Sequence, residues 1–344
     1  MSLFGKKRSE APASDRGDDK AYRDKLEQEL RIFSKNVHVH DLPDIFHYWS
    51  NKYLRPRFEA LGIQDIPDVF VKASLEAREQ KGGPVRIVSV GAGNCDFEVS
   101  FLERLALSGC TDAHIDCVDV VDEMLERGRK LASEKGLQER MGFVKADLNS
   151  IQFGNRYDLF FANQSLHHFV ELETIFDKIR KALPDHGYFV TSDMIGRNGH
   201  LRWPEALDVV HDLWKLLPAR YRFNHQLQRY EETFIDHDCS TEGFEGIRAQ
   251  DILPLLIERF QFEFFAPFSN VIDVFIDRSF GHNFSEKDPF DVAFIDFVAH
   301  LDLRLLRERK ITPTHLVAAM TKGKPRRYLS FGEDTPAQCV RIPD

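Results

Sequence analysis

The central third of the chain alternates short apolar runs with amphipathic segments, and this rhythm constrains the fold more than any other feature. Five runs rich in β-branched and aromatic residues lie at 85–90, 114–121, 142–148, 157–164 and 187–195. Strands that alternate with helices form a parallel sheet covered on both faces. We therefore predict an α/β, doubly wound, mostly parallel sheet that binds its ligand at the carboxyl ends of the strands.

The flanking regions differ in composition from this core. Residues 1–20 carry few large apolar side chains, so we predict a disordered arm there. Helical spacing predicts an N-terminal helical cap at 21–80, before the core at 81–196. For 197–325 we predict a helical and aromatic insertion, a lid or acceptor region, and the last strands, followed by a tail at 326–344. The many phenylalanines of the insertion fit either core packing or an apolar lid.

Charge and cysteine content argue against several kinds of partner. The formal net charge is −9 without a long basic run, so we expect no nucleic-acid partner. The five cysteines include no CxxC pair, and neither HDLPDIFH nor IDHDC has a familiar ligand spacing, so we predict no metal. The N-terminus is too polar for a signal peptide, and no apolar run approaches the ~18 residues of a spanning helix. We expect a cytoplasmic monomer or homodimer without membrane attachment.

The first apolar run ends in a glycine turn, IVSVGAGNCDFE at 87–98. Gly91 and Gly93 suit a strand-to-helix turn in which a Cβ would collide with a ligand and free N–H groups face it. A dinucleotide-binding turn has a third glycine where this chain has Asp96. Because a carboxylate repels a pyrophosphate and attracts an ammonium group, the turn predicts a cationic or zwitterionic cofactor rather than NAD.

Two acids end the next two predicted strands. Asp119 ends the second strand, 26 residues after Gly93, and Asp147 ends the third. An acid in this position either accepts hydrogen bonds from the hydroxyls of a ribose or caps the following helix. The residues alone leave both roles open for each acid.

Taken in order and spacing, VRIVSVGAGNCDFE, HIDCVDVVDEML, GFVKADL and YDLFFANQSLHHF resemble the motifs of class I S-adenosylmethionine-dependent methyltransferases. The resemblance covers about 80–195, and the later pattern is similar to the family's end, where a reversed last strand enters the sheet. It implies S-adenosyl-L-methionine as the cofactor. The residues it implies for binding are Gly91, Ala92 and Gly93 at the methionine part, Asp119 on the ribose, Val120, Asp147 and Leu148 on the adenine, and Asn163 and Gln164 near the methyl group.

Two positions depart from the family pattern. Ser89 stands where the family often has an acid, and Cys95 replaces the third small residue of the glycine loop. We expect Asp96 to hold part of the amino-acid end of the cofactor instead. An N-terminal helix commonly closes over the cofactor in this family, although helix packing is the alternative role for the candidates in WSNKYLRPR, which are Trp49, Asn51 and Arg55.

The histidines of SLHHF follow the fourth strand, beside the expected methyl group. Methyl transfer is a direct displacement that mainly requires alignment and exclusion of water, and a neutral histidine suits proton removal from a hydroxyl. His167 and His168 are therefore the candidate catalytic bases, with packing as the alternative role. Polar residues that would cover the acceptor site are His200, His225, Tyr230, Glu231, Asp236, His237 and Asp238.

The sequence predicts a transferase that methylates a small-molecule acceptor, with oxygen as the expected acceptor atom. NQSL ends the fourth strand in place of an NPPY-like or DPPY-like tetrapeptide, which disfavours methylation of nucleic-acid bases. A noncatalytic methyltransferase-like binding module is the alternative from another class. An NAD-dependent oxidoreductase is a further alternative. The missing third glycine argues against it.

Overall fold

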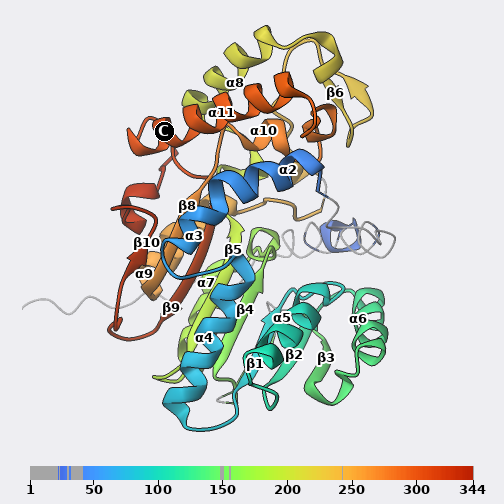
Figure 1. Ribbon diagram of the computed structural model, residues 1–344. Helices are drawn as coiled ribbons and strands as arrows, with labels where there is room; N and C mark the ends of the chain where they lie inside the picture. Colours follow the sequence, from blue (N-terminus) through green and yellow to red (C-terminus); the bar gives the residue numbers. More distant parts are fainter. Residues whose placement is uncertain are drawn as a thin grey trace, which may run out of the picture.

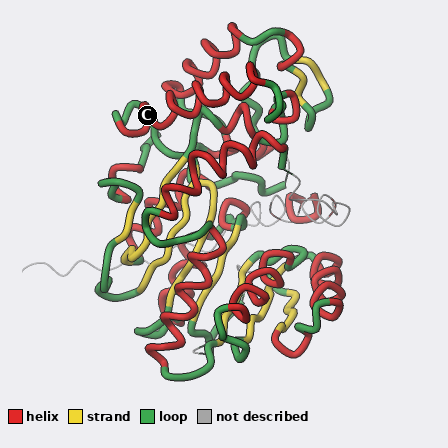
Figure 2. Tube along the Cα trace, viewed as in Figure 1, coloured by secondary structure: helices red, strands yellow, loops and turns green. Residues whose placement is uncertain are grey.

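The computed structural model describes residues 22, 24–28, 31, 42–147, 151–154, 156–241 and 243–343. The predicted arm at 1–20 and the candidate Leu148 lie outside these described residues. Figure 1 shows a sheet flanked by helices and a mostly helical unit beyond its upper end. Figure 2 shows the same division, with the main strands below and mostly helices and loops above.

The sheet has eight strands in the order β10-β8-β9-β5-β4-β1-β2-β3. All pairs among the five predicted strands are parallel, with bounds β1 (Arg86–Val90), β2 (His114–Asp119), β3 (Met141–Lys145), β4 (Leu159–Asn163) and β5 (Tyr188–Met194). β9 (His315–Thr321) is antiparallel to both its neighbours, β5 and β8 (Gln261–Phe268). The predicted doubly wound, mostly parallel sheet and its reversed last strand are confirmed.

Helices cover both faces of this sheet. Phe160 and Phe161 belong to different apolar clusters, because successive side chains of a strand point to opposite faces. One face packs against α4 (Ile66–Lys81), α5 (Asp96–Leu107) and α6 (Asp122–Glu134). The other packs against α7 (Leu172–Ala182) and α9 (Ala249–Arg259). With both faces covered, the strand ends are the places where a ligand can reach the sheet.

The N-terminal cap is more broken than the sequence pattern predicts. Within the predicted helical cap, the structure has α2 (Asp44–Trp49), the π-helical turn η1 (Ser50–Leu54) and α3 (Arg55–Glu59) in immediate succession. The pattern also does not identify α4, although its ends carry clear signals. The Asp65 carboxylate accepts a hydrogen bond from the Asp68 N–H, and Gly82 closes the helix at φ 69°.

The upper unit joins segments that are far apart in the sequence. It contains α8 (Pro204–Leu216), the hairpin strands β6 (Phe223–Asn224) and β7 (Arg229–Tyr230), α10 (Asp273–Ile276) and α11 (Pro289–Arg307). α2 packs against α10 and α11 there (Figure 1). Trp214 and Phe280 are buried with ring centroids 4.8 Å apart. These buried aromatic side chains of the insertion form core.

The predicted tail is part of the fold. Its residues form β10 (Leu329–Ser330), which pairs with β8, and a short 3-10 helix at Pro336–Cys339. Arg326 and Arg327 form ion pairs with Glu76 on α4. Residues 326–343 therefore extend the sheet and tie it to α4.

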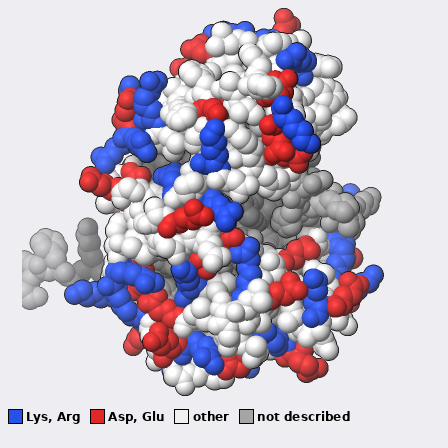
Figure 3. Space-filling view, in the orientation of Figure 1, with Lys and Arg blue, Asp and Glu red and all other residues white. Residues whose placement is uncertain are grey.

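Two surface properties bear on possible partners. On the face in Figure 3, acidic and basic side chains are interspersed without a continuous basic stripe. Across the described residues, no helix combines the length and apolar character needed to cross a membrane.

Candidate cofactor site and histidine cluster

The predicted cofactor residues come together along the carboxyl ends of the central strands, which we call the cofactor edge. β4, β1, β2 and β3 are neighbours, so their carboxyl ends bring Asn163, Gly91–Gly93, Asp119 and Asp147 to the same side in that order. Val120 directly follows Asp119, and Gln164 follows Asn163 with an exposed side chain. Parallel strand order therefore assembles a site from residues spread over 73 positions of sequence, from Gly91 to Gln164.

Asp119 fixes the conformation of the glycine turn. Its carboxylate accepts hydrogen bonds from the Gly93 N–H at 2.8 Å and the Val121 N–H at 2.9 Å. Burial raises the pKa of Asp119, against the backbone N–H groups, which stabilise its charged form. Each carboxylate oxygen has a second lone pair, so both remain able to accept a ligand hydroxyl.

Gly91 lies too close to the turn after β4 for any side chain. Its φ is 70°, and a Cβ there would lie 2.6 Å from the Cβ of Ser165. The Gly91 N–H donates to the Val118 carbonyl at 2.9 Å, and the Ser165 hydroxyl donates to the Val90 carbonyl at 2.8 Å. These hydrogen bonds connect the turn to β2 and the end of β1 to the segment after β4.

Glu98 forms a buried hydrogen bond with Ser89. The Ser89 hydroxyl donates to Glu98 Oε1 at 2.6 Å, and both side chains are buried. Burial raises the pKa of Glu98 to about 7, although the hydrogen bond from Ser89 opposes the rise. A carboxyl group of α5 therefore lies beside Ser89 on β1.

Replacing Glu98 with glutamine is expected to flatten the pH dependence of stability. Because the folded pKa of about 7 exceeds the unfolded value of 4.5, the folded state holds the proton more tightly. Its contribution is present below pH 4.5 and is lost as the pH rises through 7, a change of about 3 kcal/mol. Urea unfolding at pH 5 and pH 8 measures this difference, with the exposed Glu103→Gln on the same helix as control. Equal pH slopes for the parent and the Glu98 variant contradict the expectation.

Three other residues predicted to bind the cofactor form no described hydrogen bond with the glycine turn. Asp96 is exposed in the first turn of α5. Trp49 is buried in the apolar cluster under α2, and Asn51 is exposed on η1. Among the described residues, neither Trp49 nor Asn51 forms a hydrogen bond with the turn, because α2 packs on the upper unit. Their cofactor role stays a prediction without support from these contacts.

Described residues of the N-terminal segment do reach the site. The Tyr22 hydroxyl donates to Asp147 Oδ2 at 3.3 Å, and its ring lies 5.4 Å from the ring of Phe244. Lys25 Nζ donates to the Ser240 carbonyl at 3.2 Å. Tyr22 therefore links the end of β3 to the loop that contains Phe244.

A cluster of histidines lies around Glu245, next to the cofactor edge. His167 Nε2 and His200 Nε2 lie 3.4 Å and 2.7 Å from Glu245 Oε1, and His168 Nε2 lies 3.4 Å from Glu245 Oε2. On its other side, His167 Nδ1 lies 2.6 Å from Oδ1 of Asp193, a buried residue of β5. His168 also acts on the Asp119 carboxyl, whose charged form it favours.

Electrostatics keep His167 positively charged in this arrangement. Burial opposes the charge, but the Asp193 and Glu245 carboxylates outweigh it and raise the pKa of His167 to about 10. Burial lowers the pKa of His200, with Glu245 opposing the change. A protonated imidazole cannot accept a proton, so His167 is not a base in this state.

Sequence analysis does not identify Asp193, Glu245 or Glu98. Asp193 lies near the end of β5, and Glu245 lies in a loop without a motif. Neither residue therefore carries a local sequence signal for a functional role. Of the polar candidates in the insertion, His200 joins the cluster. The others lie elsewhere: His225 bonds to Asn283, Glu231 is buried against Asn224 and Arg229, and the exposed or partly buried ones are Tyr230, Asp236, His237 and Asp238.

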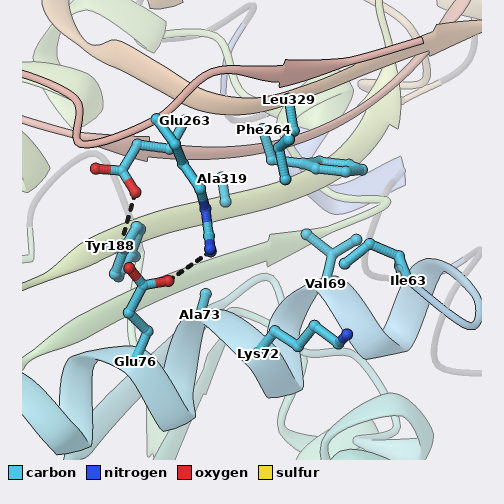
Figure 4. Close-up of a pocket in the computed structure, with 11 residues that line it drawn as sticks. Ile63, Val69, Lys72, Ala73, Glu76, Tyr188, Glu263, Phe264, Ala319 and Leu329 are labelled. Atoms are coloured by element: carbon cyan, nitrogen blue, oxygen red, sulfur yellow. Dashed lines mark hydrogen bonds and ion pairs between the residues drawn. The ribbon is translucent and has the colours of Figure 1, made fainter. Parts of the chain in front are cut away.

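The measured cavities do not mark the cofactor site. The cavity in Figure 4 lies between α4 and the sheet, is lined by Val69, Ala73, Glu76, Tyr188 and Phe264 among others, and holds about 30 Å³. That is room for about one water. A larger cavity of about 420 Å³ lies beside Arg197, Trp203 and Asp238 in the upper unit.

Comparison with known proteins identifies the core. A family profile described as "Methyltransferase domain" matches residues 87–187. The ubiquinone/menaquinone biosynthesis C-methyltransferase UbiE of Rhodopseudomonas palustris is 30% identical over 115 residues, which is 33% of this chain and 43% of that protein. The UbiE of Allorhizobium ampelinum is 26% identical over 119 residues, 34% of this chain and 44% of that protein. The chain thus matches less than half the length of these relatives.

The solved structures that match this chain include several methyltransferases. A putative sarcosine dimethylglycine methyltransferase from Galdieria sulphuraria has 12% identity and a TM-score of 0.43, over 86% of this chain and 96% of that chain. The geranyl diphosphate C-methyltransferase of Streptomyces coelicolor A3(2) has 11% identity and a TM-score of 0.40, over 70% of each chain. The profile match spans β1 through α7, so residues 87–187, with the glycine turn and Asp119 inside them, match an S-adenosylmethionine-dependent methyltransferase domain.

Proposed function

We propose that this protein is an S-adenosyl-L-methionine-dependent methyltransferase that methylates a small molecule at oxygen. The observation that carries the proposal is the Asp119 carboxylate, which accepts hydrogen bonds from the glycine turn and has lone pairs left for a ribose. The exposed Asp96 at the head of α5 supports a cofactor with an ammonium group over one with a pyrophosphate.

The residues at the strand ends fit this cofactor by their donor and acceptor types. We assign Gly91–Gly93 to the methionine part, Asp119 to the ribose hydroxyls, Val120 and Asp147 to the adenine, and Asn163 and Gln164 to the region of the methyl group. The bound cofactor supplies an electrophilic sulfonium methyl. The chain's own residues hold its two ends, orient the acceptor and keep water out.

His168 is the better candidate for the base. Its side chain is 19% exposed, whereas that of His167 is 5% exposed and is held in the charged form by Asp193. We propose that the acceptor hydroxyl gives its proton to His168 Nε2. The nearby Glu245 Oε2 then stabilises the imidazolium. His167 holds Glu245 and the acceptor in position.

Methylation at carbon is the second candidate. The curated relatives are named as C-methyltransferases, and a hydroxyl that loses its proton also activates a neighbouring ring carbon. Tracing an isotopically labelled methyl group into the product of a cell extract distinguishes the two. A label on an ether oxygen supports the first candidate, and a label on carbon supports the second.

Ligand-dependent stabilisation tests the cofactor itself. At a concentration of 100 times its Kd, S-adenosyl-L-methionine is expected to raise the unfolding free energy by about 2.7 kcal/mol. Thermal unfolding with S-adenosyl-L-methionine, S-adenosylhomocysteine and NAD measures the effect. Stabilisation by NAD alone would exclude the proposal. Binding of the cofactor without any labelled product from extracts would favour the noncatalytic binding module.

A further inference from the structure

We propose that His167, His200 and Glu245 bind a divalent transition-metal ion of the Zn²⁺, Co²⁺ or Fe²⁺ class. One ring nitrogen from each histidine and one carboxylate oxygen all lie within 4.8 Å of one another. Two imidazoles and one carboxylate, with positions left open, are a common donor set of catalytic sites for these ions. This reverses the prediction of no metal made from sequence.

Two of the distances between the ligand atoms are near those around an ion, and all three lie within 4.8 Å. Around a tetrahedral ion with bonds of 2.0–2.1 Å, ligand atoms lie about 3.4 Å apart. His167 Nε2 already lies 3.4 Å from Glu245 Oε1, and His200 Nε2 lies 2.7 Å from the same oxygen. The Glu245 side chain is 37% exposed, so it is free to move outward.

The surroundings of His167 are those of a metal-bound histidine. Asp193 is fully buried and accepts from His167 Nδ1 at 2.6 Å. Its other oxygen accepts from the N–H groups of Ser165 and Leu166, at 2.9 and 2.7 Å. A carboxylate held in this way keeps a proton on Nδ1, so Nε2 is the nitrogen that would bind an ion, as in metal-bound histidines whose other ring nitrogen bonds a carboxylate.

The partners of Glu245 give a separate argument. In the described part of the chain, Glu245 pairs with three histidines and with no lysine or arginine. Its carboxylate is therefore surrounded by side chains that can themselves bind a metal ion.

His200 reaches the cluster through an unusual backbone conformation. Its φ is 57°, in the left-handed region that non-glycine residues adopt infrequently. Left-handed residues of this kind cost free energy and occur more often at functional sites. The three ligands come from positions 167, 200 and 245, so no short spacing in the sequence could reveal them.

The role of the ion rests on the proposed function, whereas its binding does not. A cation at this site would lower the pKa of an acceptor hydroxyl beside the sulfonium. The proton passes to His168, the O–CH₃ bond forms as the S–CH₃ bond breaks, and the sulfonium becomes a thioether. His168 remains outside the ligand set, on the opposite oxygen of Glu245.

Titration with Co²⁺ tests the site directly. The full chain, without a histidine tag and stripped of metal, is titrated while the visible absorption of bound Co²⁺ is recorded, and Zn²⁺ is then added as competitor. We expect one equivalent of Co²⁺ to bind and Zn²⁺ to displace it. His200→Asn and Glu245→Gln are each expected to weaken binding at least tenfold, and Asp193→Asn by about tenfold.

His186→Asn is the matched control. His186 Nε2 also pairs with a carboxylate, that of Asp158 at 2.7 Å, but this pair lies at the amino end of β4. Its Co²⁺ affinity is expected to stay within twofold of the parent. If the parent is folded and binds S-adenosyl-L-methionine but takes up no stoichiometric Co²⁺, the metal site is wrong. It is equally wrong if Glu245→Gln, a nearly isosteric change that keeps the fold, binds Co²⁺ as tightly as the parent.

The two proposals fail separately. Stoichiometric Co²⁺ binding without binding of S-adenosyl-L-methionine contradicts the proposed function and leaves the metal site standing. Binding of S-adenosyl-L-methionine without Co²⁺ does the reverse.

Discussion

Asp119→Ala is expected to lower the affinity for S-adenosyl-L-methionine at least a hundredfold. On the proposed function the carboxylate accepts two ribose hydroxyls, and charge-assisted hydrogen bonds contribute about 1.5–3 kcal/mol each, so about 2.7 kcal/mol is a conservative loss. The variant also removes the acceptor for the Gly93 N–H, which loosens the glycine turn. Isothermal titration calorimetry measures the change.

Two further variants separate charge from position in this experiment. Asp119→Asn keeps an oxygen for the Gly93 N–H but loses the charge, so an intermediate loss of affinity is expected. Asp122→Asn removes an exposed acid from the same edge, three residues along the chain, and is expected to change the affinity less than twofold. If Asp119→Ala binds S-adenosyl-L-methionine as the parent does, Asp119 has no place in the site.

Asp193→Asn is expected to reduce methyl transfer at least a hundredfold with little effect on cofactor affinity. Asp193 accepts from His167 Nδ1 and from the N–H groups of Ser165, Leu166 and Met194, so it orients the whole turn after β4. An amide in its place no longer favours the charged or Nδ1–H form of His167. Asp193→Ala, which leaves these donors unpaired, is expected to lose about 3–5 kcal/mol of stability.

Histidine NMR and urea unfolding distinguish this positioning role from a purely structural one. The ring resonances of His167 are expected to change their protonation or tautomer in Asp193→Asn, while S-adenosyl-L-methionine affinity stays within threefold. Asp158→Asn is the control, because Asp158 holds His186 and Lys81 at the opposite end of the sheet. It should lose stability without losing methyl transfer. Unchanged His167 resonances in Asp193→Asn would rule out the orienting role.

Local sequence signals were sufficient for the parallel strands, whereas the reversal of the last strand was implied by the family resemblance. Apolar runs such as VRIVSV and HLVAAMTK are buried in the sheet at the predicted positions, because burial on both faces requires continuous apolar residues. The cap was harder to predict. The chain from Pro43 to Glu59 changes from α-helix to π-helix and back, and no periodicity specifies that change.

The cofactor edge and the histidine cluster differ in how much the sequence could reveal. Gly91, Gly93, Asp119 and Asp147 each follow a strand, so their meeting point follows from parallel topology alone. His200 and Glu245 come from loops of the insertion, and their distance from His167 depends on how those loops pack. Pattern analysis therefore identified candidate bases without the carboxylates that decide their charge.

The sequence by itself determined the doubly wound sheet, the position of the glycine turn and the acids beside it. These follow from short-range periodicity and from the fixed geometry of parallel strands. Only the tertiary structure decided that the Glu98 carboxyl lies beside Ser89, and that Asp193, Glu245 and three histidines form one cluster. The physical reason is that protonation and metal affinity depend on contacts within a few ångströms, which packing creates between residues that are distant in the chain.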